Sequence, residues 1–171
     1  MTWLVCLVLI SLVIQTNAYD CSATKPDKRC KKTVESVFGK RDKGMSGSLD
    51  CKGTEKYTNV QGTGYYPAPI DPEGGCVDMK GKPLRTLQDY LKGKVDFVSV
   101  AMDKAISGPR YGAEICIPEM NKKYKKRIRF KVVDHGPSFD GKGPVKVDIC
   151  TKTAKDSCDG SINRKLTVYF V

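Results

Sequence analysis

The stretch RIRFKVV, residues 127–133, decides the fold class. Its side chains alternate strictly, with Ile128, Phe130 and Val132 on one side and basic side chains on the other. This period of two predicts a β-strand with one buried face. The stretch VKVDIC, residues 145–150, alternates in the same way and predicts a second strand whose valines and isoleucine point inward.

Further short apolar segments, broken by glycine and proline, flank these two strands. They predict strands within residues 60–66, 95–103, 112–117 and 166–171. Few helices are expected. One helical face is formed by Leu84, Leu87 and Leu91, and a short helix is predicted over Lys152–Ser157 with Thr151 as its cap. Six or so short strands with so few helices predict a mainly β domain, either a barrel or a sandwich.

Residues 1–18 have the layout of a secretory signal peptide. An apolar run over residues 3–14 is too short to span a bilayer, and small residues precede a predicted cleavage after Ala18. No basic residue precedes that run, which leaves an uncleaved anchor as the alternative. We therefore expect a secreted, extracellular protein with a Cys-containing extension over residues 19–57 and one barrel domain over residues 58–171.

Seven cysteines follow residue 18, and an oxidising compartment would join them in disulfides whose pairing the sequence leaves open. The odd number leaves one thiol, either buried and free or paired with another chain. The chain has no CxxC pair and no His–Cys cluster, so no metal site or cofactor is expected. The seven are Cys21, Cys30, Cys51, Cys76, Cys116, Cys150 and Cys158.

A formal net charge of +11 predicts an anionic partner, although such a charge can also serve solubility alone. For a secreted protein a glycan is a better candidate than nucleic acid, and no later segment is apolar enough to cross a membrane. The basic run over residues 122–127 is expected to form an exposed hairpin loop, which either grips an acidic polymer or is simply solvated.

Three aspartates occupy positions that strand propensity disfavours. Asp103 and Asp134 each close an apolar stretch, and Asp148 lies inside one. A carboxylate in a groove of a small barrel can have a raised pKa and act as an acid or a base. The alternative is that each aspartate caps a turn or neutralises one of the many cations.

The order of these segments resembles the three-aspartate (3D) domain, found in membrane-bound lytic transglycosylases of the A type and in stationary-phase survival proteins. The resemblance covers roughly residues 60–171. It implies a six-stranded double-psi β-barrel, and residues 133–137 and 147–149 are also similar to expansin-type barrels. The segments that carry it are residues 62–67, 98–103, 111–118, 132–136, 143–149 and 168–171.

The resemblance implies that Asp148 is an acid–base catalyst that cleaves a glycosidic bond, with peptidoglycan as the leading substrate. Such an acid protonates the leaving oxygen and then helps the sugar's own hydroxyl to close an anhydro ring, so a single carboxylate suffices. Asp134 would support it, and Asp103 would be the third member, with a structural role possible. Residues expected to contact the glycan are Tyr65, Tyr66, Tyr111, His135 and Lys146.

Two departures keep other functions open. After Asp134 the chain continues as HGPSF, where the 3D family has threonine and small glycine-rich residues, and the large substrate-holding domain of the bacterial enzymes is absent. The alternatives are a non-catalytic, expansin-like module that binds glycan, and a secreted effector or defence protein that binds another protein. His135 is the only histidine, which excludes a ribonuclease with paired histidines and leaves a place at the groove rim or in the turn.

Overall fold

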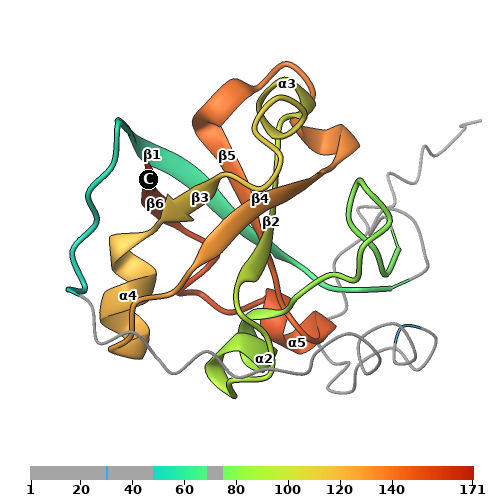
Figure 1. Ribbon diagram of the computed structural model, residues 1–171, viewed down its shortest axis with the longest axis horizontal. Coiled ribbons are helices and arrows are strands. Elements are labelled where there is room, and N and C mark those ends of the chain that lie inside the picture. Colours follow the sequence, from blue (N-terminus) through green and yellow to red (C-terminus); the bar gives the residue numbers. More distant parts are fainter. Residues whose placement is uncertain (1–29, 31–47, 69–74) are drawn as a thin grey trace, which may run out of the picture.

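A computed structural model describes residue 30 and residues 48–68 and 75–171 of the protein (Figure 1). The expected signal peptide, Cys21 and most of the expected N-terminal extension lie outside the described residues. The first strand begins at Glu55, slightly before the expected start of the barrel at residue 58.

Six strands form a closed barrel in this part of the chain, so the expected mainly β fold is confirmed and takes the form of a barrel. Their order around the barrel is β1-β5-β2-β4-β3-β6. The end of β6 lies beside the start of β1, where Glu55 pairs with Phe170 (Figure 1). The strands are β1 (Glu55–Tyr65), β2 (Val98–Met102), β3 (Glu114–Cys116), β4 (Phe130–His135), β5 (Lys146–Cys150) and β6 (Lys165–Phe170).

The strand pairings repeat between the first three strands and the last three. The β1–β5 pairing matches the β4–β2 pairing, and both are parallel. The β1–β6 pairing matches the β4–β3 pairing, and both are antiparallel. The two remaining pairings, β2–β5 and β3–β6, are antiparallel. Each is unchanged when every strand of the first half is exchanged with its equivalent in the second half, that is, β1 with β4, β2 with β5 and β3 with β6. The ladder pattern therefore has an internal two-fold symmetry.

The barrel interior is filled by apolar side chains of every strand. Ile128, Phe130 and Val132 are fully buried, as the alternation at residues 127–133 predicted. Val145 was expected to point inward as well, but it is 58% exposed, because residues Gly143–Val145 form the 3-10 helix η3 and β5 begins only at Lys146.

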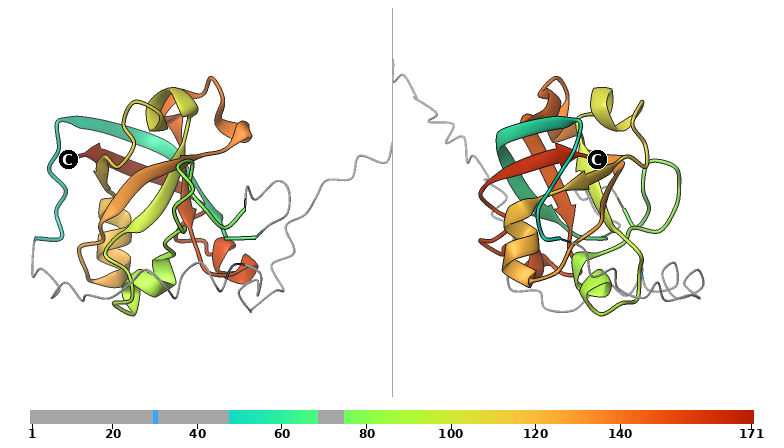
Figure 2. Two further views of the ribbon diagram at one scale, coloured as in Figure 1. Left: turned by 45° about the vertical axis from the view of Figure 1, so that its right-hand side comes forward. Right: turned by 60° about the vertical axis from the view of Figure 1, so that its left-hand side comes forward.

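Short helices close the two ends of the barrel. Figure 2 shows α3 (Lys104–Ser107) at one end and α2 (Leu87–Leu91), α4 (Pro118–Tyr124) and α5 (Ala154–Ser157) at the other. The start of α5 was predicted wrongly. Its cap is Thr153, which accepts a hydrogen bond from the Asp156 amide, whereas the Thr151 hydroxyl donates to the Tyr65 carbonyl.

The basic run at residues 122–127 is not a hairpin loop. Lys122 and Lys123 lie in the last turn of α4, which begins with Pro118 in its first turn and ends at Lys125 in the left-handed conformation. Proline suits a first helical turn because its missing N–H would have no partner there. Within the described residues, no helix is both long and apolar enough to span a bilayer.

Disulfides join two residues that precede β1, Cys30 and Cys51, to later parts of the chain. Cys51 is bonded to Cys116 on β3, and Cys30 to Cys76. Cys158 is also disulfide-bonded, with its partner outside the described residues. Among the described cysteines, Cys150 is a free thiol, and it is buried. Disulfides are compatible with an extracellular protein.

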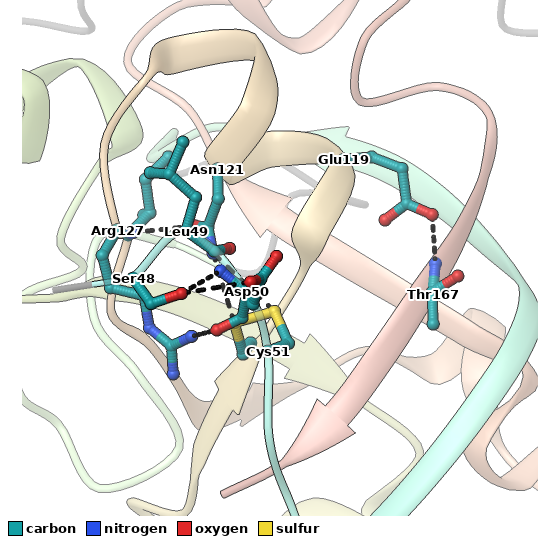
Figure 3. Close-up of a disulfide and its surroundings, with 10 residues drawn as sticks. Ser48, Leu49, Asp50, Cys51, Glu119, Asn121, Arg127 and Thr167 are labelled. Atoms are coloured by element: carbon teal, nitrogen blue, oxygen red, sulfur yellow. Dashed lines mark hydrogen bonds between the residues drawn. A yellow bond between two sulfur atoms is a disulfide. The ribbon is translucent and has the colours of Figure 1, made fainter.

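The Cys51–Cys116 disulfide is surrounded by hydrogen bonds to backbone groups (Figure 3). The Asn121 amide donates to the Leu49 carbonyl and accepts from the Ile128 N–H, at 3.0 and 2.9 Å. The Arg127 guanidinium donates to the Asp50 carbonyl at 2.7 Å. The segment before β1 is therefore fixed to α4 and to the chain that leads into β4.

Candidate functional site

Asp134 and Asp148 lie on the face of the sheet opposite the barrel core, on either side of Ala101. Ala101 on β2 is the register partner of Asp148 on β5 and of Asp134 on β4. Paired residues share one face of a sheet, and two strand spacings place the backbones of the two aspartates about 10 Å apart. Ala101 carries only a methyl group, and the Tyr65 side chain packs in the same cluster as Ala101.

A β-bulge places Asp134 on this outer face. Val100 pairs with Val132, but the next residue of β2, Ala101, pairs with Asp134, so Val133 is an extra residue on β4. In an unbroken register, Asp134 would stand opposite Met102, whose side chain is fully buried in the core. Bulges commonly redirect side chains near functional sites.

Asp148 combines a buried oxygen with a partly exposed side chain. Its Oδ1 atom is buried without a hydrogen-bond partner among the described residues, and so is the hydroxyl of Thr63, its register partner on β1. Burial raises the pKa of Asp148, while the Thr63 side chain and the positive charge of Lys146 offset part of that rise. A carboxyl group in this setting stays protonated to a higher pH than the carboxyl group of an ordinary aspartate.

The pKa of Asp134 is raised to about 6, chiefly by burial. Two hydrogen bonds to its carboxylate oppose that rise. The His135 N–H donates to Oδ1 at 2.9 Å, and the Tyr65 hydroxyl donates to Oδ2 at 3.2 Å.

Tyr65 positions Asp134 and offers little surface to a sugar. Its side chain is 6% exposed, and its ring belongs to a small cluster with Leu84, Ala101, Phe139 and Cys150. Only its hydroxyl reaches the site, so the expected stacking role for Tyr65 is replaced by a positioning one. Tyr66, directly after β1, is half-buried.

Lys146 and His135 flank the two carboxyl groups. Lys146 stands two residues before Asp148 and shares its face of β5, with its Nζ 3.4 Å from Ser138 Oγ and 4.5 Å from the Phe139 ring centre. The Nδ1 atom of His135 is buried without a hydrogen-bond partner among the described residues. Both side chains are half-buried.

Asp103 has a structural place in the fold. Its carboxylate caps α3 by accepting the Ala105 N–H at 2.9 Å, and it accepts the Gly143 N–H at 2.6 Å. These bonds, the one from Gly143 first, lower the pKa of Asp103. Asp103 therefore fixes η3, which leads into β5, and β5 begins two residues before Asp148.

Three features of the site have no clear signal in the sequence. Thr63 follows only from the β1–β5 register. Cys150 was one of seven equivalent cysteines, yet it is free among those that the structure describes, and burial keeps its thiol protonated by raising its pKa. Asp78, which the sequence did not single out, lies in a neighbouring pocket and accepts a hydrogen bond at 2.7 Å from Tyr111, one of the expected glycan contacts. In the described residues, no group of three or more His, Cys, Asp or Glu side chains is arranged to hold a metal ion.

Replacing Asp134 with Asn is expected to remove a pH dependence of stability. Because the folded-state pKa of Asp134 is about 6 and the ordinary value is 3.8, the folded protein holds this proton more tightly than the unfolded chain. That stabilisation is complete below about pH 4 and is lost as the pH rises through 6, by at most about 3 kcal/mol. Urea unfolding at several pH values between these limits and neutrality measures it.

The difference in unfolding free energy between Asp134→Asn and the wild type is expected to change steadily with pH. The variant is expected to gain stability relative to the wild type as the pH rises, because the amide has no proton to lose. Parallel stability curves across this pH range would show that Asp134 titrates normally.

In comparisons with protein-family models and with curated proteins, neither a family model nor a curated protein matches the sequence.

Proposed function

We propose that this protein is a secreted enzyme that cleaves a cell-wall glycan of the peptidoglycan type, with Asp148 as the acid–base residue. The observation that carries the proposal is the setting of Asp148, which is half-buried on the outer face of the barrel with an unpartnered buried oxygen and a raised pKa. A general acid needs such a pKa to carry its proton near neutral pH. The net charge of +11 favours an anionic polymer.

The proposal includes a double-psi barrel related to the 3D domain. Its support is the two-fold ladder pattern, with two equivalent parallel pairings within a barrel of six strands. The segments that resemble the 3D domain contribute to all six strands, and the two aspartates that flank Ala101 are those matched to the family's catalytic and supporting positions, Asp148 and Asp134.

In the proposed reaction, protonated Asp148 gives its proton to the glycosidic oxygen as the bond to the anomeric carbon breaks. The resulting carboxylate then takes the proton of a hydroxyl on the same sugar, and that oxygen closes the anhydro ring on the anomeric carbon. Asp134, held by Tyr65, places a second carboxyl group across Ala101, where its negative charge would stabilise the oxocarbenium-like transition state.

Two carboxyl groups on one face of the sheet would also allow a hydrolase. Inverting glycosidases use a pair of carboxyl groups that admit a water molecule between them. In that case Asp134 would act as the base that activates water. The two reactions differ in their products, because only the lytic one gives anhydro sugars.

Mass spectrometry of purified peptidoglycan after incubation with the protein tests the proposal. Anhydro fragments would establish the lytic reaction, and fragments with an added water would establish hydrolysis. Intact glycan would contradict both. Retention of the protein on that intact glycan would then indicate an expansin-like binding module, and capture of a protein in place of glycan would indicate an effector.

A further inference from the structure

A pocket lined by charged and apolar side chains lies next to Asp134 on β4. It is an open cavity of about 150 Å³ between the segment that precedes α2 and the outer side of β4. About five water molecules would fill such a volume, so it can take a small charged group and part of a sugar ring. Its walls are Asp78, Lys82, Pro83, Arg85, Phe97, Tyr111, Gly112, Lys131 and Val133.

The charges that line this pocket are predominantly positive. Three of the lining residues are cations, Lys82, Arg85 and Lys131, and one is an acid, Asp78. Asp78 already accepts hydrogen bonds from the Lys80 and Lys82 amides and from the Tyr111 hydroxyl. Its charge is therefore directed toward donors of the pocket wall. Arg85 is paired with Asp96 at 2.8 Å, so Lys82 and Lys131 are the cations that remain in excess.

Two aromatic rings hold these cations in place. The Arg85 guanidinium lies 3.9 Å from the Phe97 ring centre, and the Lys131 Nζ lies 5.0 Å from the same centre. Lys82 lies 5.6 Å from the Tyr111 ring centre. Cation–π contacts restrict the long side chains before any ligand arrives, which lowers the entropy lost on binding. Within the described residues, neither Lys82 nor Lys131 forms a salt bridge.

The pocket adjoins the proposed catalytic groups along β4. Lys131 and Val133 line the pocket, and Asp134 is the next residue of the same strand. The two places also interact electrostatically, because the charge of Asp78 helps to raise the pKa of Asp134 and that of Asp134 helps to raise the pKa of Tyr111. A glycan chain cleaved at the carboxyl pair would therefore place a neighbouring sugar at the pocket.

We propose that this pocket binds the anionic substituent, a carboxylate or a sulfate, of an acidic sugar in the substrate chain. The inference rests on the proposed glycan-cleaving function and adds the chemical group that the protein selects. Guanidinium and ammonium groups suit both oxyanions, since each offers several charged donors to the same group.

Titration of the protein with short oligosaccharides tests the proposal. A uronic acid oligomer, a sulfated oligomer and a neutral oligomer of equal length are added in turn, and binding is followed by calorimetry and by the backbone amide signals of Gly112 and Lys131. We expect an acidic oligomer to bind at least tenfold more tightly than the neutral one, to shift these signals and to weaken with added salt. The stronger of the two acidic oligomers identifies the substituent.

Lys131→Met and Lys82→Met retain the apolar stems but remove the charges, so each should weaken binding of the acidic oligomer about tenfold and leave the neutral one unaffected. Lys165→Met is the matched control, because Lys165 is exposed on β6 and outside the pocket. Equal binding of all three oligomers, or equal binding by the pocket variants and the control, would overturn the inference. If peptidoglycan is still cleaved in that case, the proposed function stands and only the pocket's role is overturned. If acidic oligomers bind selectively but no glycan is cleaved, the pocket's role stands and the proposed function is overturned.

Discussion

Asp148→Asn lowers the rate of glycan cleavage by about a hundredfold or more, if Asp148 is the acid–base residue, because a positioned acid commonly contributes that factor. The amide matches the carboxyl group in shape but has no proton to give to the leaving oxygen. It also carries no charge, so the variant avoids the cost of ionising a buried group and should unfold at or above the wild-type temperature. Activity of the wild type should fall as the pH rises through the raised pKa of Asp148.

Release of soluble fragments from peptidoglycan measures this effect. Asp140→Asn is a suitable control, because Asp140 is exposed and lies in the loop between η2 (Pro137–Phe139) and η3. A folded Asp148→Asn protein that cleaves at the wild-type rate would remove Asp148 from the mechanism. Loss of cleavage in both variants would show that the effect is not specific to Asp148.

Removal of the Cys51–Cys116 disulfide, by replacing both cysteines with Ala, should cost about 4 kcal/mol of unfolding free energy. The bonded cysteines are 65 residues apart, and the entropy of closing a loop of that length in the unfolded chain gives this figure at 25 °C. Urea unfolding measures the loss. Cys150→Ala is the control, because it removes a buried thiol that cross-links nothing.

The control separates the cross-link from packing. Cys150→Ala should lower the unfolding free energy only by the cost of the small cavity that one sulfur atom leaves. The disulfide variant is therefore expected to lose substantially more unfolding free energy than this control. Equal losses would mean that the hydrogen bonds around the disulfide, such as those of Asn121 (Figure 3), already fix the segment before β1.

The sequence predicted the core of the barrel better than the orientation of its site. A strict period of two identified Ile128, Phe130 and Val132 as buried, because burial of one strand face follows directly from alternation. The same rule failed at Val145, where a 3-10 helix precedes the strand. It could not place Asp134 either, since one extra residue on β4 changes the face on which it lies.

Features that depend on long-range pairing had no local signal. Seven cysteines give no indication that Cys150 is left unbonded in the described part of the chain, since disulfide pairing depends on which strands become neighbours. The cationic pocket combines residues from four separate parts of the chain, from Asp78 to Val133. Each of its lysines alone is indistinguishable from a solvated one.

The ladder pattern has a consequence for how the chain folds. Around the barrel, strands of the first half (β1, β2 and β3) alternate with strands of the second half (β4, β5 and β6), so every ladder joins one half to the other. Neither half can form a ladder of this barrel by itself, and a chain emerging from its N-terminus must wait for β4 before the first of these ladders can form. Such distant pairings make folding slow. The Cys51–Cys116 bond encloses β1 and β2 and ends in β3, so it holds the first half compact while it waits.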